Sequence, residues 1–160
     1  MVRVASSLLY ELFRKFPGML PNVLVVDFNV NLHPRIAALG AVVKYGDLSN
    51  HETLQHVGID KARVIACTIP DDVLKGTTNR QIVAAARRVN PQAVIIANAI
   101  ELQESRRLYE AGADYVFLQR IETARTVEQV IERALAGEIR EYRAEVESRE
   151  GEWHTRNEVL

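Results

Sequence analysis

The chain alternates short apolar runs with stretches in which apolar residues recur every three or four positions. The apolar runs are continuous, which is typical of strands buried on both faces of a parallel sheet. We predict strands over 23–28, 41–47, 62–70, 93–99 and 115–118. The other stretches predict helices over 5–16, 33–40, 49–59, 77–89, 101–112 and 122–136.

Strict alternation of strands and helices predicts a parallel sheet with right-handed crossovers. We therefore predict an α/β fold with a doubly wound, Rossmann-like sheet in one domain over residues 1–136. Residues 137–160 keep only a thin apolar stripe among charges, which indicates a charged C-terminal helix or tail acting as an exposed helix, a linker or a partner-facing arm. Two helices have apolar faces that we expect to point inward. These faces comprise Leu8, Leu9, Leu12, Phe13 and Phe16, and Val127, Val130, Ile131, Ala134 and Leu135.

Two of the predicted strands end on an acid. The run that begins at Val23 ends at Asp27, and the next strand ends at Gly46 and Asp47. Open α/β sheets bind ligands at the carboxyl ends of their strands, and an acid that ends the second strand commonly accepts hydrogen bonds from a ribose. Asp27 is therefore either a nucleotide ligand or a solvated aspartate at a strand end.

The beginning of the chain departs from the usual nucleotide-binding pattern. Such a fold starts with a strand, a GxGxxG turn and a helix, and the ribose acid follows about 20 residues later. The helix over 5–16 is present, but no glycine occurs before Gly18 and no strand precedes the helix. Losing a central strand leaves backbone groups of its neighbours unpaired. We expect that the chain is a fragment of a longer protein; the alternative is that another chain fills the gap.

Composition and charge narrow the function classes. The 160 residues are 48% hydrophobic and 26% charged, and the net charge of −1 suits a soluble domain and gives no general attraction to nucleic acid. No apolar run reaches the length of about 18 residues needed to span a bilayer, so we expect a cytosolic protein. The single cysteine, Cys67, lies in an apolar run, which indicates a buried, inert thiol.

The strand ends lack a recognisable catalytic centre or metal site. No nucleophile, general base and oxyanion donor converge there, so we predict no catalytic residues and no enzyme activity. The four histidines lack the spacing of metal ligands, so we predict no metal site. Thr77 and Thr78 are better interpreted as helix caps than as part of a phosphate-binding loop, because KGTTN has no glycine at the upstream position.

Five motifs, in their order and spacing, resemble the N-terminal, nucleotide-binding half of the regulator of K+ conductance (RCK, or TrkA-N) domain. These motifs are VVDFN, VVKYGDLSN, VIACTIPD, PQAVIIANA and LYEAGADYVFL, and the resemblance covers about residues 5 to 136. VASSLLYEL and IPDDVLKGTTN are most similar to the variant appended to Kef-like cation/proton antiporters. The resemblance implies a cytosolic, ligand-sensing regulatory domain of a potassium or cation/proton transport protein.

The resemblance also implies a set of cofactor-binding residues. Asp27 would meet the ribose, with Asn29 also counted among the cofactor-binding residues. Gly46, Asp47 and Leu48 would border the adenine, and Thr68 and Ile69 would line the floor of the cleft. Ser6 would offer a hydroxyl to a phosphate at a helix N-terminus, and Arg120 would reach a phosphate across a dimer. The chain departs from the family in lacking the glycine turn and in having Gln119-Arg120 where a proline is common.

The ligand implied is NAD(H), AMP or ATP, or else the site is vestigial. The implied partners are a second copy in a homodimer and a membrane transporter domain in cis or in trans, at the cytoplasmic face of the inner membrane, with no nucleic acid. Two alternatives stay open. One is a fragment of a Rossmann-type enzyme, either an S-adenosylmethionine-dependent methyltransferase or an NAD-dependent dehydrogenase, and the other is a module that only dimerises.

Overall fold

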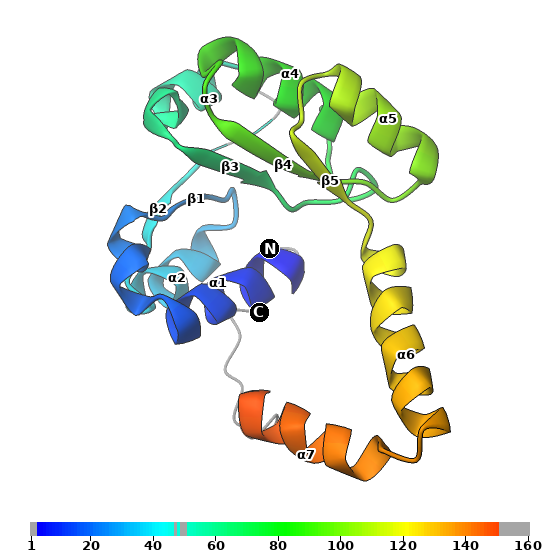
Figure 1. Cartoon of the computed structure of the whole chain (residues 1–160). Coiled ribbons are helices and arrows are strands. Elements are labelled where there is room, and N and C mark those ends of the chain that lie inside the picture. The colour runs from blue at the N-terminus through cyan, green and yellow to red at the C-terminus, as the bar shows by residue number, and fades with distance from the viewer. Residues whose placement is uncertain (1–2, 47, 49–50, 151–160) are drawn as a thin grey trace. The chain divides into compact units, whose positions relative to one another are not determined.

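A computed structural model describes residues 3–46, 48 and 51–150, which form two compact units (Figure 1). The first unit extends to Leu118 and the second begins at Gln119. The helices of the first unit are α1 (Arg3–Lys15), α2 (His33–Ala38), α3 (His51–His56), α4 (Asn79–Val89) and α5 (Leu102–Glu110). Its strands are β1 (Leu24–Val26), β2 (Val42–Lys44), β3 (Val64–Cys67), β4 (Val94–Asn98) and β5 (Tyr115–Phe117). Short 3-10 helices cover Pro17–Asn22, Val30–Leu32 and Ile59–Lys61.

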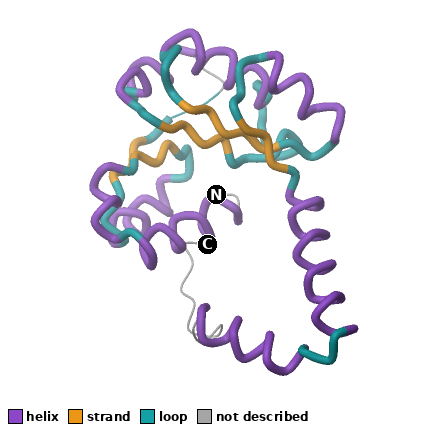
Figure 2. Tube along the Cα trace, in the orientation of Figure 1, coloured by secondary structure: helices purple, strands orange, loops and turns teal. Residues whose placement is uncertain are grey.

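All strands pair in parallel, but in two separate sheets (Figure 2). β1 pairs with β2, and β4 lies between β3 and β5. The parallel α/β architecture predicted from the sequence is confirmed. In the doubly wound strand order 3-2-1-4-5-6, the position between these two sheets belongs to the first strand. Within the described residues, no strand pairs with the second edge of β1 or of β3.

The β1–β2 sheet packs against the elements that surround it in sequence. Its core joins buried side chains of α1, α2 and the 3-10 helices to the half-buried Val25 and Val43 of the strands. The buried members are Leu9, Leu20, Leu32, Ile36 and Ala41. Leu8, Phe13 and Phe16, expected to point inward, are 39%, 44% and 59% exposed, so this part of the prediction is wrong. α1 ends at Lys15, and the chain turns into a 3-10 helix at Pro17, so the apolar face of α1 stops short of Phe16.

The β3–β4–β5 sheet is covered by α4 and α5 (Figure 1). Ile95 and Ala97 of β4 are fully buried, as expected for a central strand. Thr78 caps α4 in a capping box with Gln81, which confirms its interpretation as a cap. Asn90 follows α4, and its amide joins three backbone carbonyls of 59–62 to the start of β4.

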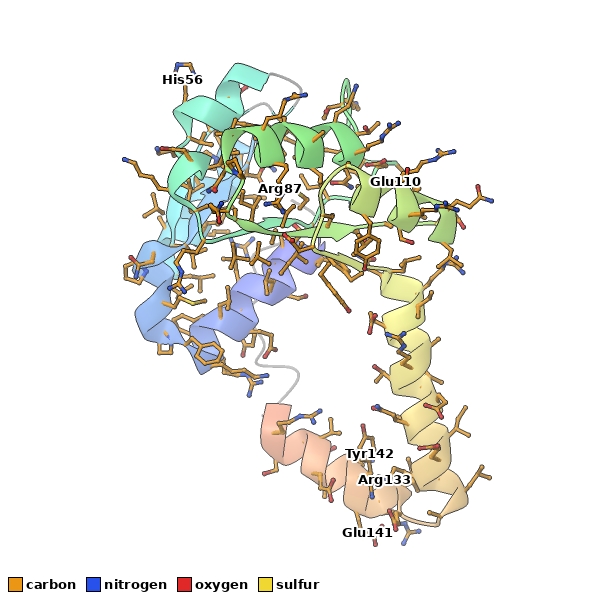
Figure 3. The ribbon with its side chains drawn as sticks, turned by 45° about the horizontal axis from the view of Figure 1, so that its top comes forward. His56, Arg87, Glu110, Arg133, Glu141 and Tyr142 are labelled. Atoms are coloured by element: carbon orange, nitrogen blue, oxygen red, sulfur yellow. The ribbon has the colours of Figure 1, made fainter. Side chains whose placement is uncertain are left out.

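The second unit consists of α6 (Gln119–Leu135) and α7 (Ile139–Glu150), joined at Gly137 with φ +78°. Arg133 makes a 2.6 Å ion pair with Glu138 and lies 5.7 Å from the ring centroid of Tyr142 (Figure 3). No described residue of α6 is buried, and Leu135 is 84% exposed. The expectation that Val127, Val130, Ile131, Ala134 and Leu135 point into a core is therefore wrong. An apolar stripe predicts only that a helix packs against something, and α7, the other helix of the second unit, does not bury this one.

No helix within residues 3–46, 48 and 51–150 combines the length and the apolar character needed to cross a membrane.

Candidate functional site

Asp27 lies at the carboxyl end of β1 and is 8% exposed. Its backbone N–H donates to the carbonyl of Lys44 at 3.1 Å, which continues the pairing with β2 by one residue. Its Oδ1 accepts the N–H of Asn29 at 2.7 Å, so the carboxylate also closes a local turn. Asp27 Oδ2 has no hydrogen-bond partner among the described residues. One carboxylate oxygen therefore fixes the turn, and the other remains to accept a hydrogen bond.

The turn after Asp27 is held by further local hydrogen bonds. Asn29 caps the 3-10 helix by accepting the N–H of Asn31 at 3.2 Å. The His33 Nε2 atom lies 3.0 Å from the carbonyl oxygen of Asp27, to which it donates in the Nε2-protonated tautomer. Asn29 thus engages its side-chain oxygen in the turn and donates its backbone N–H to Asp27, while its role in binding a cofactor stays a prediction.

Gly46 lies on the neighbouring strand end and is buried. A Cβ added to it would stand 2.5 Å from Val26 Cγ1 and 2.8 Å from Thr53 Cγ2, closer than any packing allows. Glycine is therefore required here to let β1, β2 and α3 pack together. Leu48 is half-buried in a turn, and Asp47 lies outside the described residues.

Thr68 and Ile69 follow β3 and are half-buried. The carbonyl of Ile69 accepts the Asn79 Nδ2 amide at 2.7 Å, and the same amide contacts the Asn98 carbonyl at 3.3 Å. Asn79 thus ties the carboxyl end of β3 to that of β4. The N–H of Asn79 donates to Asp71 Oδ1 at 2.6 Å, so Asp71 serves the N-terminus of α4.

Sequence patterns did not single out Asn79 and Asn98, both 2% exposed. The Oδ1 atoms of both have no partner among the described residues. One signal was available for Asn98, because it ends an apolar run as Asp27 does. Their burial makes them internal polar groups, for which a bound water is the usual partner.

Ser6 and Arg120 lie in different units, and the predicted reach of Arg120 to a phosphate across a dimer stays a prediction. Ser6 lies within α1 and is fully buried, and its hydroxyl lacks a partner among the described residues. It is therefore not the N-cap. Arg120 is exposed in the first turn of α6, in the second unit. Within one sheet the structure thus brings together Asp27 and Gly46, while Thr68 and Ile69 end a strand of the other sheet.

Cys67 ends β3, and burial raises the pKa of its thiol to about 12. The thiol is therefore protonated at neutral pH and is a poor nucleophile, in agreement with its interpretation as an inert residue.

The chain is similar to known proteins of one kind. It is 35% identical over 94 residues to YbaL of Escherichia coli (strain K12), a protein named as a cation/proton antiporter. This alignment covers 59% of the chain, which spans only 16% of the length of that relative. The crystal structure of the TrkA-N domain of YbaL from Escherichia coli matches with a TM-score of 0.68 and 28% identity, over 80% of this chain and 89% of that one.

A more distant likeness concerns the fold alone. The GsuK channel bound to NAD matches with a TM-score of 0.54 and 24% identity, over 69% of this chain and 19% of that one. The sequence pattern of the TrkA-N domain family itself matches residues 2–119, which include every strand and helices α1 to α5. The chain therefore belongs to the TrkA-N domain family.

Proposed function

We propose that this TrkA-N domain is a non-enzymatic regulatory domain of a potassium or cation/proton transport protein and that it binds an adenine nucleotide. The observation that carries the proposal is the placement of Asp27 beside Gly46 at the carboxyl ends of two paired parallel strands. Ligands of open α/β sheets bind at this edge. Asp27 Oδ2 would accept a ribose hydroxyl while Oδ1 keeps the turn in place.

The choice among nucleotides depends on how the phosphates are held. Ser6 is fully buried, so its hydroxyl is not placed to contact a pyrophosphate. The backbone N–H groups of the first turn of α1 remain as donors. AMP, ADP and ATP are the first ligands to compare with NAD(H), and the GsuK channel, which has a similar fold, is bound to NAD.

Calorimetric titration of the chain with AMP, ATP and NADH tests the binding proposal. The variant Asp27→Asn keeps an Oδ1 acceptor for the Asn29 N–H but removes the carboxylate charge. We expect saturable binding by the natural chain and a loss of about tenfold or more in Asp27→Asn, because a hydrogen bond to a charged group contributes about 1.5–3 kcal/mol. The exposed Asp60→Asn is the matched control and should bind normally. Equal affinity of Asp27→Asn and the natural chain would exclude the proposed site.

The proposed transport role rests on the similarity to YbaL. The domain would act at the cytoplasmic face of the inner membrane, on a membrane domain in the same or another polypeptide. Regulation would require that the nucleotide bind two arrangements of the domain with different affinity. The gene sequence around this segment tests the role: apolar membrane spans in the same frame or in an adjoining gene are expected, and an adjoining catalytic domain would contradict it.

We also propose that the domain forms a homodimer through α6. Val127, Ile131 and Leu135 follow one another at four-residue spacing and are 51%, 53% and 84% exposed. An unpartnered stripe of this kind marks an association surface. Sedimentation analysis should show a dimer for the natural chain and for Gln129→Glu, and a monomer for Ile131→Glu, which puts the same charge into the stripe. A natural chain that sediments as a monomer at high concentration would contradict the dimer.

A further inference from the structure

Three of the four polar groups of Asp27 have partners in the structure. Its N–H donates to the carbonyl of Lys44 at 3.1 Å, and its Oδ1 accepts the N–H of Asn29 at 2.7 Å. Its carbonyl oxygen lies 3.0 Å from Nε2 of His33. Among the described residues, only the Oδ2 atom of Asp27 has no partner. The backbone and the carboxylate of Asp27 are therefore held by three different residues.

His33 stands on a backbone that is fixed independently of the strand end. It begins α2, and its own N–H donates to the carbonyl of Val30. Pro34 follows directly and restricts the backbone in the first turn of the helix. The neighbouring Leu32 and Ile36 are 8% and 0% exposed and belong to the apolar core that α1 and α2 share. The half-buried imidazole ring therefore approaches the strand end from a fixed base.

The carbonyl that His33 contacts controls the direction of the Asp27 side chain. A peptide group is planar, so fixing this carbonyl fixes the rotation about the Cα–C bond of Asp27. The same peptide group lies between the two ends of the hydrogen bond from Asn29 to Oδ1, so both contacts stabilise one turn. Without the imidazole donor, the Oδ2 atom would sample more directions. A ligand would then bind more weakly, because binding would have to restrict that motion.

We infer that His33 is the positioning residue of the nucleotide site. Its Nε2–H donates to the carbonyl of Asp27 and thereby holds Oδ2 where a ribose hydroxyl can reach it. The inference rests on the nucleotide binding proposed above and adds to it a residue that does not touch the ligand. It requires a proton on Nε2, which one neutral tautomer and the imidazolium both carry. When the ring is neutral, its tautomer therefore reports on the contact without any ligand.

The tautomer of His33 in the natural chain is the first test. Long-range ¹H–¹⁵N NMR of the ¹⁵N-labelled chain in mildly alkaline solution distinguishes a protonated ring nitrogen from a bare one. We expect Nε2 to be protonated and Nδ1 to be bare, and the signals are assigned by their absence from His33→Gln. A ring that is protonated on Nδ1 instead overturns the inference, whatever the result with nucleotides.

Calorimetric titration of a matched pair of variants is the second test. His33→Gln places a carboxamide N–H donor near the position of Nε2, whereas His33→Met has a side chain of the same length without that donor. Titration uses whichever of AMP, ATP and NADH the natural chain binds most tightly. His33→Gln should bind within about twofold of the natural chain, and His33→Met should bind about three- to tenfold more weakly. Equal affinities of the two variants overturn the inference.

Asn31→Ala is the local control for this pair. The exposed Asn31 contributes its backbone N–H to the turn, and alanine keeps that group. The variant should therefore bind the nucleotide as the natural chain does. A loss equal to that of His33→Met would show that any substitution in the turn weakens binding, and would overturn the special role of His33.

A double-mutant cycle shows whether His33 acts through Asp27. In the Asp27→Asn background the carboxylate is gone, so His33→Met should lower the affinity by less than about twofold. An equal loss in both backgrounds means that His33 contacts the nucleotide itself, which overturns the positioning role and leaves the proposed binding site standing. A natural chain that binds none of the three nucleotides overturns the proposed function and this inference with it. The tautomer, measured in the natural chain without ligand, decides the His33 contact even if His33→Met does not fold.

Discussion

The two sheets of the first unit are built from the same kind of β-α unit but are stabilised differently. The β3–β4–β5 sheet has a fully buried central strand and two side chains that clamp it, Asn90 and Arg87. Arg87 donates to the carbonyls of Pro91, Ala93 and Gly112 and to the carboxylate of Asp114 (Figure 3). The β1–β2 sheet is held by apolar packing of α1 and α2, and its strand ends carry the exposed Phe28 and Tyr45.

This difference indicates that the two sheets have different roles within one fold. Buried polar clamps fix a single arrangement, because each unpaired group would be costly. The strand ends of β1 and β2 are exposed and are held by apolar packing alone, so a bound ligand could fix their conformation. If the proposed nucleotide binds, β3–β4–β5 would serve as the scaffold and the ends of β1 and β2 as the region that responds to it.

The largest expected effect is the loss of the Asn90 clamp. Asn90 Nδ2 donates to the carbonyls of Ile59, Asp60 and Ala62, and Oδ1 accepts the N–H groups of Gln92 and Ala93. Asn90→Ala should lower the free energy of unfolding by about 3 kcal/mol, because it leaves several buried groups unpaired. Urea unfolding measures this value. The exposed neighbour Arg88→Ala should stay within about 0.5 kcal/mol of the natural chain, and an equal loss there would remove the special role of Asn90.

A second effect concerns the Arg87 clamp and is tested at Gly112. This glycine has φ +108°, and an added Cβ would lie 3.0 Å from Arg87 Cγ. Gly112→Ala should destabilise the chain by about 2–3 kcal/mol through backbone strain and displacement of Arg87. Gly137→Ala is the matched control, since its φ is +78° and no atom lies within 4 Å of the added Cβ. Gly137→Ala should lower the free energy of unfolding by about 1 kcal/mol, through backbone strain alone. Thermal unfolding compares the two variants, and equal shifts in the melting temperature would argue against the clamp.

The β1–β2 sheet is tested at Gly46. Gly46→Ala would press against Val26 and Thr53 and should lower stability by about 1–3 kcal/mol. Adding Val26→Ala should return part of the loss, because the shortened side chain makes room for the new methyl group. A double-mutant cycle by chemical unfolding measures this coupling. Strictly additive effects of the two substitutions would show that Gly46 and Val26 do not share this space.

The smallest effect is a pH dependence from Asp114. The N–H of Ile95 and the guanidinium of Arg87 hold the pKa of this carboxyl below its usual value. A carboxyl with a lowered pKa in the folded state stabilises the protein above its unfolded pKa of about 3.9, and the contribution is lost as the pH falls toward the folded pKa. The stability difference between the natural chain and Asp114→Asn should therefore be constant above about pH 5 and should shrink below about pH 4. A stability difference between the natural chain and Asp114→Asn that stays constant until the protein unfolds in acid would show that the Asp114 carboxyl does not cause the pH dependence.

Much of the fold could be predicted because its elements are locally encoded. The apolar runs mark all five strands, and Thr78 with Gln81 marks the start of α4. The partner of α6 could not be predicted, because periodicity shows that a stripe is apolar without showing what covers it. The division into two sheets could not be predicted either, because an apolar run identifies a strand without showing which other strand it pairs with.

The candidate site was predicted in part. Asp27 and Gly46 could be placed at strand ends because a polar or small residue that ends an apolar strand is visible in the sequence, and their role in binding a nucleotide stays a prediction. Ser6 was misplaced, because a serine near a helix start is a common cap but can equally lie one turn inside the helix. The commitment of Asn29 to a turn and the clamps of Asn79, Asn90 and Arg87 depend on contacts between distant segments. No local pattern reports such contacts.

The most direct test of the division between scaffold and responsive region is a residue-resolved NMR titration of the ¹⁵N-labelled chain with AMP and NADH. Saturable amide shifts should concentrate at Asp27, Phe28 and Gly46, with little change at Ile95 and Ala97 in the scaffold. Shifts that centre on β4 and β5, or the absence of any saturable shift with either nucleotide, would contradict the account.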